Sequence, residues 1–202
     1  MKRGVKLSKQ LTGSIRIISG RWRGTKLPVA NVTGLRPTTD RNKETLFNWL
    51  MPYVNNANCL DVFAGSGGLG FEALSRYAQS VTFIELDKGA IVNLQQNLQK
   101  LKISSEQATI LPGNALQLLA GLNQQFDLIF LDPPFHQNLL PPIIQLIDEL
   151  NLLTEDGVLY IESESQAADY KIPANWQLVK ERQSSQLCSR LYRCNRLNTI
   201  YS

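Results

Sequence analysis

The stretch best suited to chemistry in this sequence is Asp132-Pro133-Pro134-Phe135, which directly follows an apolar run at residues 126–131. That run has the length and composition of a buried strand, and the prolines end it because neither can donate to a sheet ladder. A carboxylate, a proline carbonyl and an aromatic face then lie together at a strand end, where open α/β sheets bind ligands. This combination suits a planar amino group, such as the exocyclic amine of a nucleobase. The same residue types are common in simple turns, so the motif alone leaves both interpretations open.

A second candidate site is the glycine-rich loop within residues 59–70. Gly65, Gly67 and Gly70 match the dinucleotide pattern G-x-G-x-x-G, and glycines let a backbone approach a ligand closely. Asp61 stands just ahead of the loop, where its charge disfavours a pyrophosphate but suits a cation such as the amino group of S-adenosylmethionine (SAM). Glu85 ends the next predicted strand, where a carboxylate can accept both hydroxyls of a ribose. NAD would use Glu85 as well, so Asp61 is the residue that favours SAM.

The loop and the strand ends together define the predicted cofactor site. Asn114 follows the third predicted strand, where it could contact an adenine edge or cap the next helix. The predicted SAM-binding residues are Asp61, Phe63, Ala64, Gly65, Ser66, Gly67, Glu85, Leu86, Asn114, Ala115 and Asp132. One histidine, and three cysteines without a CxxC pair, predict no metal site and no disulfide framework.

Strand and helix patterns alternate through most of the chain. Strands are predicted at residues 58–63, 81–85, 107–111, 126–131 and 157–162, and helices at 69–78, 88–101, 114–121 and 138–151. This alternation predicts an α/β fold, a mostly parallel sheet with helices on both faces. Two further strands, at 177–181 and 187–194, predict a C-terminal antiparallel hairpin and bring the sheet to seven strands. Residues 14–37 predict a small N-terminal β-hairpin around two glycines, with a helix beginning after residues 38–40.

The charge distribution is uneven. Residues 1–43 hold eleven lysines and arginines against one acid, whereas the rest of the chain holds ten basic and sixteen acidic residues. A basic arm on an acidic body predicts a polyanionic partner, although such runs are also found in tails that only confer solubility. Residues 1–13 have little to bury and are predicted to be a disordered basic tail. No apolar run is long enough to cross a bilayer, and a cytoplasmic location is expected.

Several motifs together resemble a known family. Asp61-x-Phe63-x-Gly65-x-Gly67, Glu85 and Asp132-Pro133-Pro134-Phe135 resemble the class I SAM-dependent methyltransferases that modify exocyclic amines. The segments at 16–20, 35–41 and 44–50, with Gly24, are similar to the N-terminal signature of the RsmD family. The resemblance covers nearly all of the chain after Ser14, but the loop at 183–186 carries no matching motif.

The resemblance implies a Rossmann-like fold, SAM as methyl donor and the N2 amine of a guanine in 16S ribosomal RNA as acceptor. It also implies an assembled 30S particle as substrate and a monomeric enzyme. In this hypothesis the Asp132 carboxylate and the Pro133 carbonyl accept the two N–H groups of the amine, and Phe135 stacks on the base. Residues 38–202 would form the methyltransferase domain and 14–37 an RNA-binding extension. The predicted RNA-binding residues are Arg16, Arg21, Arg23, Lys26, Arg36 and Arg41.

Other functions remain compatible with the sequence. An adenine-N6 or protein-glutamine methyltransferase would share the fold and the turn motif but act on another acceptor. A more distant alternative is an NAD-dependent oxidoreductase, and another is an RNA-binding module built on an inactive methyltransferase fold. Binding of SAM would separate the oxidoreductase from the others, and turnover would exclude the inactive module.

Overall fold

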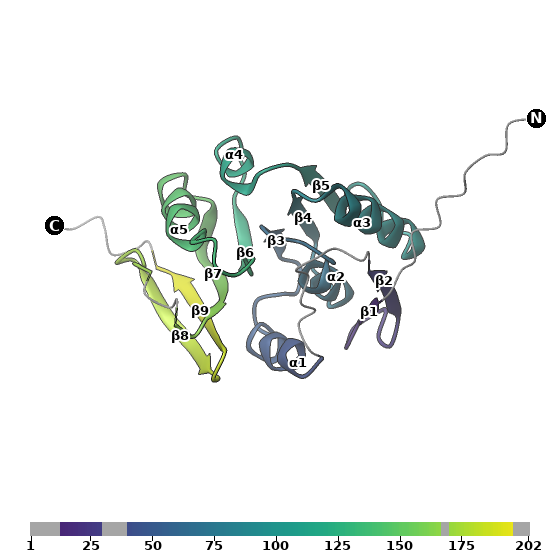
Figure 1. The fold of residues 1–202 in the computed structure, drawn as a ribbon, viewed down its shortest axis with the longest axis horizontal. Helices are drawn as coiled ribbons and strands as arrows, with labels where there is room; N and C mark the ends of the chain where they lie inside the picture. Colours follow the sequence, from purple (N-terminus) through teal and green to yellow (C-terminus); the bar gives the residue numbers. More distant parts are fainter. Residues whose placement is uncertain (1–12, 30–39, 167–169, 196–202) are drawn as a thin grey trace, which may run out of the picture.

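The computed structural model describes residues 13–29, 40–166 and 170–195 (Figure 1). Residues 1–12 of the predicted tail at 1–13 lie outside the described residues, whereas Gly13 belongs to a strand. Residues 30–39, which include Arg36, and the side chain of Arg41 also lie outside the described part. Among the described helices, none is long and apolar enough to cross a membrane.

The described strands form two sheets. A two-stranded antiparallel sheet pairs β1 (Gly13–Arg16) with β2 (Lys26–Val29). The larger sheet has seven strands in the order β5-β4-β3-β6-β7-β9-β8. These strands are β3 (Asn58–Asp61), β4 (Ser80–Glu85), β5 (Ala108–Pro112), β6 (Phe126–Leu131), β7 (Leu153–Glu164), β8 (Trp176–Gln183) and β9 (Leu187–Cys194).

Strand order and direction confirm the predicted fold class. Strands β3 to β7 are parallel, and β9 runs antiparallel to both β7 and β8. The chain builds outward from β3 to β5 and then returns to add β6 on the other side of β3. This reversal creates a switch point between β3 and β6, and ligands of such sheets bind at the carboxyl ends of strands there.

Helices cover both faces of the large sheet (Figure 1). On one face α1 (Asp40–Trp49), α2 (Gly68–Ser75), α3 (Lys88–Lys100) and the small hairpin share a core that includes Leu27, Phe47 and Phe71. On the other face α4 (Ala115–Leu119) and α5 (Leu140–Glu149) share a core that includes Leu119 and Ile143. Each cluster is fully apolar at its centre, so burial of these side chains is the main term that holds the layers together.

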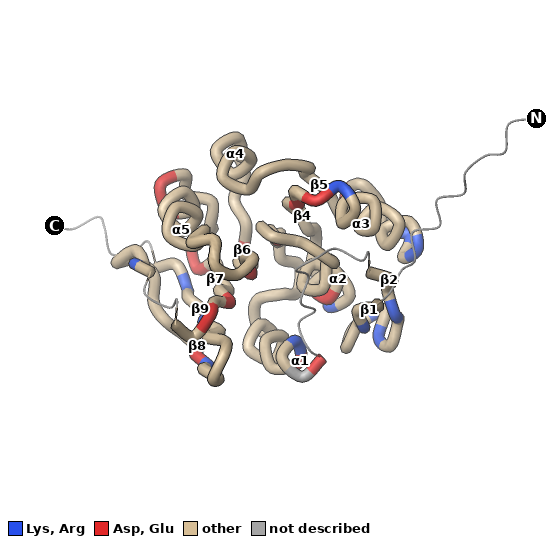
Figure 2. The backbone as a smooth tube through the Cα atoms, viewed as in Figure 1, with Lys and Arg blue, Asp and Glu red and all other residues tan. Residues whose placement is uncertain are grey.

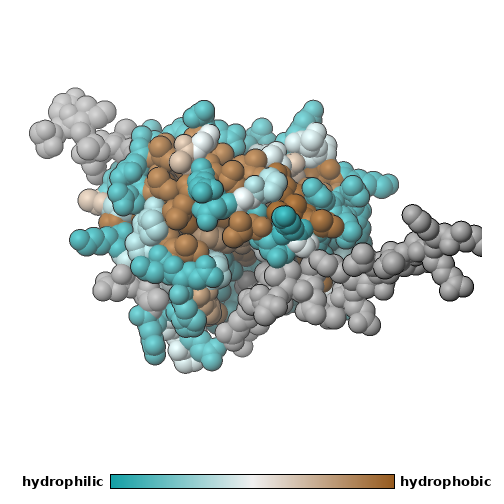
Figure 3. Space-filling view, turned by 45° about the horizontal axis from the view of Figure 1, so that its top comes forward, coloured by the Kyte–Doolittle hydropathy of each residue, from teal (hydrophilic) through white to brown (hydrophobic). Residues whose placement is uncertain are grey.

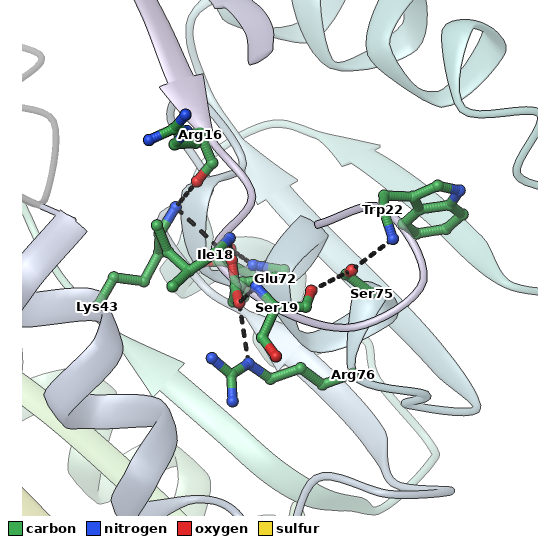
Figure 4. Close-up of polar contacts among 10 residues, drawn as sticks. Arg16, Ile18, Ser19, Trp22, Lys43, Glu72, Ser75 and Arg76 are labelled. Carbon is green, nitrogen blue, oxygen red and sulfur yellow. Dashed lines mark hydrogen bonds and ion pairs between the residues drawn. The ribbon is translucent and has the colours of Figure 1, made fainter. Parts of the chain in front are cut away.

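The small hairpin is fixed to α2 by one buried carboxylate, Glu72 (Figure 4). The backbone N–H groups of Ile18 and Ser19 donate to Glu72 at 2.7 and 3.0 Å, and Arg76 Nε donates at 2.9 Å. Lys43 Nζ lies 3.8 Å from the same carboxylate, whose side chain is fully buried. The hairpin is therefore a docked part of the domain.

Gly20 lets the hairpin approach this closely. Its φ of 82° favours glycine, and a Cβ there would lie 1.8 Å from the backbone oxygen of Ser75. Ser75 Oγ donates to the Ser19 carbonyl at 2.6 Å and accepts from Trp22 N at 3.1 Å. The hairpin thus contributes mainly backbone groups to this contact, and the side chains of Glu72 and Ser75 on α2 bind them.

Several element boundaries differ from the sequence predictions. Strand β7 starts four residues earlier than the predicted 157, because Phe126 pairs with Leu153 before a register shift brings Leu128 opposite Val158. Helix α5 starts at Leu140, since prolines fit only the first turn of a helix. Helix α2 ends at Ser75, and Tyr77 then adopts a left-handed φ of 69°.

Candidate active site

A large cavity of about 1190 Å³ opens at the carboxyl ends of the central strands. Residues after β3, β4, β5 and β6 line it, so it lies at the switch point that the strand order creates. Helix α1 and the loop between β8 and β9 complete the wall. Among the described residues, no His, Cys, Asp and Glu side chains gather as a metal site.

Glu85 organises the half of the cavity that was predicted to bind the cofactor. Its Oε2 accepts from Gly65 N at 2.6 Å, and its Oε1 accepts from Asp87 N at 2.7 Å. The carboxylate therefore ties the glycine loop to the end of β4. Because a carboxylate can accept about four hydrogen bonds, both oxygens can also accept the hydroxyls of a ribose.

Asp61 lies at the base of the glycine loop and is almost fully buried. Gly70 N donates to its Oδ2 at 3.1 Å. Burial raises the pKa of Asp61 to about 7, against the opposing effect of the Gly70 hydrogen bond and with a smaller contribution from Glu85. An ammonium group beside Asp61 would favour the ionised form, so the site suits a ligand that carries one.

The three glycines of the G-x-G-x-x-G pattern have different structural roles. Gly65 lines the cavity, as predicted, but Gly67 is not among the lining residues. Gly67 is the residue before α2, with a left-handed φ of 78°, and a Cβ there would lie 2.4 Å from the ring of Phe71. A Cβ on Gly70 would lie 2.2 Å from the ring of Phe83. Gly67 and Gly70 thus allow close packing of α2, whereas Gly65 lines the cavity together with Gly68, which is not part of the G-x-G-x-x-G pattern.

The remaining predicted cofactor residues also line the cavity. These are Phe63, Ala64, Ser66, Leu86, Asn114 and Ala115. Asn114 caps α4, since its side chain accepts from Leu116 N at 3.0 Å and from Gln117 N at 3.4 Å.

Leu86 is 68% exposed although it is large and apolar, as expected of a residue that covers a ligand. Hydrophobic residues also gather in a band across the face shown in Figure 3.

Asp132, Pro133 and Phe135 line the same cavity from the end of β6. Burial, then the charges of Glu162 and Asp61, raise the pKa of Asp132 well above its usual range. The chain after this motif turns through left-handed conformations at His136 (φ 62°) and Asn138 (φ 49°). The carboxylate is thus presented at the mouth of the sheet beside the predicted cofactor site.

Glu162 is a cavity residue that the sequence motifs did not identify. Leu131, the last residue of β6, pairs with Ile161, so the residues that follow, Asp132 and Glu162, lie beside one another at the end of β6. The charge of Glu162 contributes to the raised pKa of Asp132, which agrees with this placement. Tyr160 OH donates to Glu162 Oε2 at 2.7 Å and lies 3.3 Å from Ser189 Oγ. Glu162 is 6% exposed. The candidate site therefore holds a buried carboxylate, Glu162, beside the half-buried Asp132.

Other lining residues were also missed. Lys43 was counted only as part of the basic arm, yet it is buried, lines the cavity and donates to the Arg16 carbonyl. Burial lowers its pKa, with Glu72 opposing that effect. The loop residues Ser184, Ser185 and Gln186 close one side, although their sequence carries no motif. These residues reach the cavity because the fold brings distant parts of the chain together, and no local sequence pattern indicates that.

The predicted RNA-binding residues divide into two groups. Arg16, Arg23 and Lys26 are exposed on the hairpin, where Figure 2 shows basic residues near those at the end of α3. Arg21 is also exposed, but it donates to the Leu74 carbonyl through Nη2 at 2.8 Å and Nε at 3.1 Å. Its guanidinium also lies 4.4 Å from the ring centre of Trp22. Arg21 therefore holds the hairpin on α2.

Comparison with known proteins places this geometry in a family. Residues 15–193 match the family model described as Conserved hypothetical protein 95. "Ribosomal RNA small subunit methyltransferase D" of Haemophilus influenzae is 53% identical over 182 residues, covering 89% of this chain and 94% of that protein. The protein of the same name from Escherichia coli K12 is 47% identical over 181 residues, covering 90% of each.

Solved structures share the fold. "Putative methyltransferase yhhF from Escherichia coli" superposes with a TM-score of 0.83 at 44% identity, covering 91% of this chain and 99% of that chain. "SMU.776, a putative methyltransferase complexed with SAH" has a TM-score of 0.66 at 14% identity, covering 84% of this chain and 54% of that one. The second likeness concerns the fold alone.

Proposed function

The chain belongs to the Conserved hypothetical protein 95 family, and we propose that it transfers a methyl group from SAM to the N2 amine of a guanine in small-subunit ribosomal RNA. Membership confirms the resemblance to the RsmD family that the motifs indicated. The enzyme is a SAM-dependent methyltransferase, so the oxidoreductase alternative no longer stands. Within the proposal it acts as a monomer in the cytoplasm on an assembled 30S particle.

One observation carries the proposal: a single cavity brings Asp132 and its two prolines beside Asp61 and Glu85. The residues present fit SAM by their chemistry. Asp61 offers a buried carboxylate to an ammonium group, and Glu85 offers two oxygens to ribose hydroxyls. Asp132 then faces the place where an amine could meet the donor.

SAM supplies a methyl group that is already activated, so the task of this chain is mainly to position the acceptor. The lone pair of the guanine amine is delocalised into the ring. Accepting its two N–H groups on Asp132 and the Pro133 carbonyl would turn that lone pair toward the methyl carbon. Phe135 would hold the base by stacking, a contact worth about 1–3 kcal/mol.

Asp132 is also suited to take the proton that the amine loses. Desolvation and the charges of Glu162 and Asp61 raise the pKa of this half-buried carboxyl, so it is a stronger base than an ordinary aspartate. The amine becomes acidic only as the new N–C bond forms, so transfer to Asp132, directly or through water, follows bond formation. The target base must leave its stack to reach this depth.

Replacing Glu85 with alanine is expected to weaken SAM binding about 10- to 100-fold, because hydrogen bonds to a charged group are worth about 1.5–3 kcal/mol. The change also releases Gly65 N and Asp87 N, which now donate to Glu85. Calorimetric titration with SAM measures the effect. Glu106→Ala, at an exposed site outside the cavity, is the matched control and should bind SAM normally. Unchanged affinity in Glu85→Ala would remove this residue from the cofactor site.

Replacing Arg16, Arg23 and Lys26 together with alanine is expected to flatten the salt dependence of RNA binding. Each lost phosphate contact reduces the slope of log K against log salt by about 0.7–0.9, or about 2–3 in all. Arg21 stays unchanged because it holds the hairpin on α2. Filter binding of small-subunit RNA at several salt concentrations measures the slope.

The control for this experiment is a triple alanine variant at Lys171, Lys180 and Arg182, which are exposed on or near β8, at the other end of the molecule from the hairpin (Figure 1). It removes the same positive charge. Equal slopes for the two triple variants would show that net charge, and not the hairpin, binds the RNA.

The test of the function itself uses methyl-labelled SAM and small-subunit particles from cells that lack the enzyme. The RNA is digested to nucleosides after reaction. Label in N2-methylguanosine is expected. Label in N6-methyladenosine would keep the fold and mechanism but change the acceptor, and a protein-bound label would point to glutamine.

A further inference from the structure

The acceptor side of the cavity holds two carboxylates side by side. Leu131 and Ile161, which pair across β6 and β7, belong to the core beneath α4 and α5. Since successive side chains of a strand alternate between faces, Glu162 points to the opposite face, toward α1, and Asp132 follows the end of β6 beside it. Tyr160 lies in the core on that face and donates to Glu162, which agrees with this orientation.

The Glu162 carboxylate is held in place by the buried side chain of Tyr160. Tyr160 is 2% exposed, and its hydroxyl lies 2.7 Å from Glu162 Oε2. Ser189 of β9 fixes that hydroxyl from the neighbouring strand at 3.3 Å.

Guanine and adenine differ in the groups that would meet this pair. On guanine, the N2 amine is flanked by N1–H, so two neighbouring positions donate hydrogen bonds. On adenine, N1 carries a lone pair beside the N6 amine. An ionised carboxylate only accepts hydrogen bonds, so it attracts N1–H and repels the adenine lone pair. The positive charge of SAM favours ionised carboxylates nearby.

We propose that Glu162 accepts the N1–H of the target base while Asp132 receives the amine, and that Glu162 thereby restricts the enzyme to guanine. The inference rests on the proposed function and adds its specificity residue. Glu162 contacts the base in this arrangement, whereas Tyr160 acts through Glu162 as a positioning residue.

The test compares wild type, Glu162→Gln, Tyr160→Phe and the control Glu155→Gln, which lies exposed on the same strand outside the cavity. The substrates are small-subunit particles lacking the modification, with the natural guanine or with 2-aminopurine at the nucleotide that wild type methylates. The analogue keeps the C2 amine but has an unprotonated N1. The analogue also lacks O6, and this loss affects all variants alike. The change in the guanine-to-analogue rate ratio between wild type and a variant therefore isolates the N1 contact.

Wild type is expected to methylate the analogue at least about 100-fold more slowly than guanine, because the carboxylate would oppose a lone pair. Glu162→Gln should act on guanine about 30-fold more slowly, yet its preference for guanine should fall to about threefold, since an amide can donate to N1. Tyr160→Phe should slow the reaction on guanine about threefold to tenfold, as expected for one lost hydrogen bond. Glu155→Gln should match wild type.

The outcomes separate the inference from the function. If wild type yields no N2-methylguanosine, the proposed function fails and this inference with it. If wild type yields it and Glu162→Gln keeps the full wild-type preference, this inference alone is overturned, even where the variant is slow. A thermal unfolding curve for Glu162→Gln distinguishes slow catalysis from loss of fold.

Discussion

Replacing Asp132 with alanine is expected to slow methyl transfer at least about 1000-fold, because acceptor alignment and proton removal are both lost. The change should leave SAM affinity within about threefold of wild type, or about 0.7 kcal/mol, since Asp61 and Glu85 remain in place. Asp132→Asn keeps the shape of the side chain but cannot take a proton. It should therefore lose nearly as much activity as the alanine variant.

Single-turnover rates at saturating SAM, with SAM affinity measured separately, distinguish these effects. Asp148→Asn on α5 is the matched control, because Asp148 lies outside the cavity and the substitution is the same. If Asp132→Asn retained wild-type turnover, the catalytic assignment would be wrong. If both activity and SAM affinity fell equally, Asp132 would belong to the cofactor site instead.

Replacing Glu72 with alanine is expected to lower the free energy of unfolding by about 3–5 kcal/mol, the usual cost of removing one partner from a buried ion pair. The variant leaves the N–H groups of Ile18 and Ser19 without their acceptor and Lys43 without its counter-charge. Glu72→Gln should lose less, because its amide oxygen can still accept one of those hydrogen bonds.

Urea unfolding measures the change in free energy, and limited proteolysis reports on the hairpin. The hairpin should become sensitive to trypsin before the main domain unfolds, since Arg16 and Arg23 are exposed cleavage sites. Glu106→Ala serves as the surface control. A loss of less than about 1 kcal/mol in Glu72→Ala would mean that apolar packing, not the carboxylate, holds the hairpin.

Much of the fold could be predicted because its signals are local. Alternation of strand and helix follows from hydrophobic periodicity and from breaks at glycine and proline, so the order of elements was correct. The start of β7 was missed because Glu155 and Asp156 resemble a loop. They lie at a register shift between the pairs Phe126–Leu153 and Leu128–Val158, so only the pairing of Leu153 with β6 extends the strand, and that pairing is not a local property.

The candidate site shows the same division. Asp61, Glu85 and Asp132 end strands and follow recognisable motifs, so their places could be predicted. Glu162 enters the cavity because β7 pairs with β6 in one register, and the sequence does not specify that register. Arg21, which is predicted to bind RNA, also reaches a carbonyl 53 residues away, a contact that charge alone cannot indicate.

The docking of the hairpin through Glu72 has a consequence for how a target nucleotide is chosen. Lys43 donates to the carbonyl of Arg16, the last residue of β1, and also lines the cavity. The hairpin is therefore held at a fixed position relative to the cavity. The distance between RNA phosphates on the arm and a base in the cavity would then be constant. If the hairpin binds RNA as proposed, the enzyme would select its nucleotide by its distance from a folded RNA element. The sequence of the neighbouring bases would then contribute little to the selection.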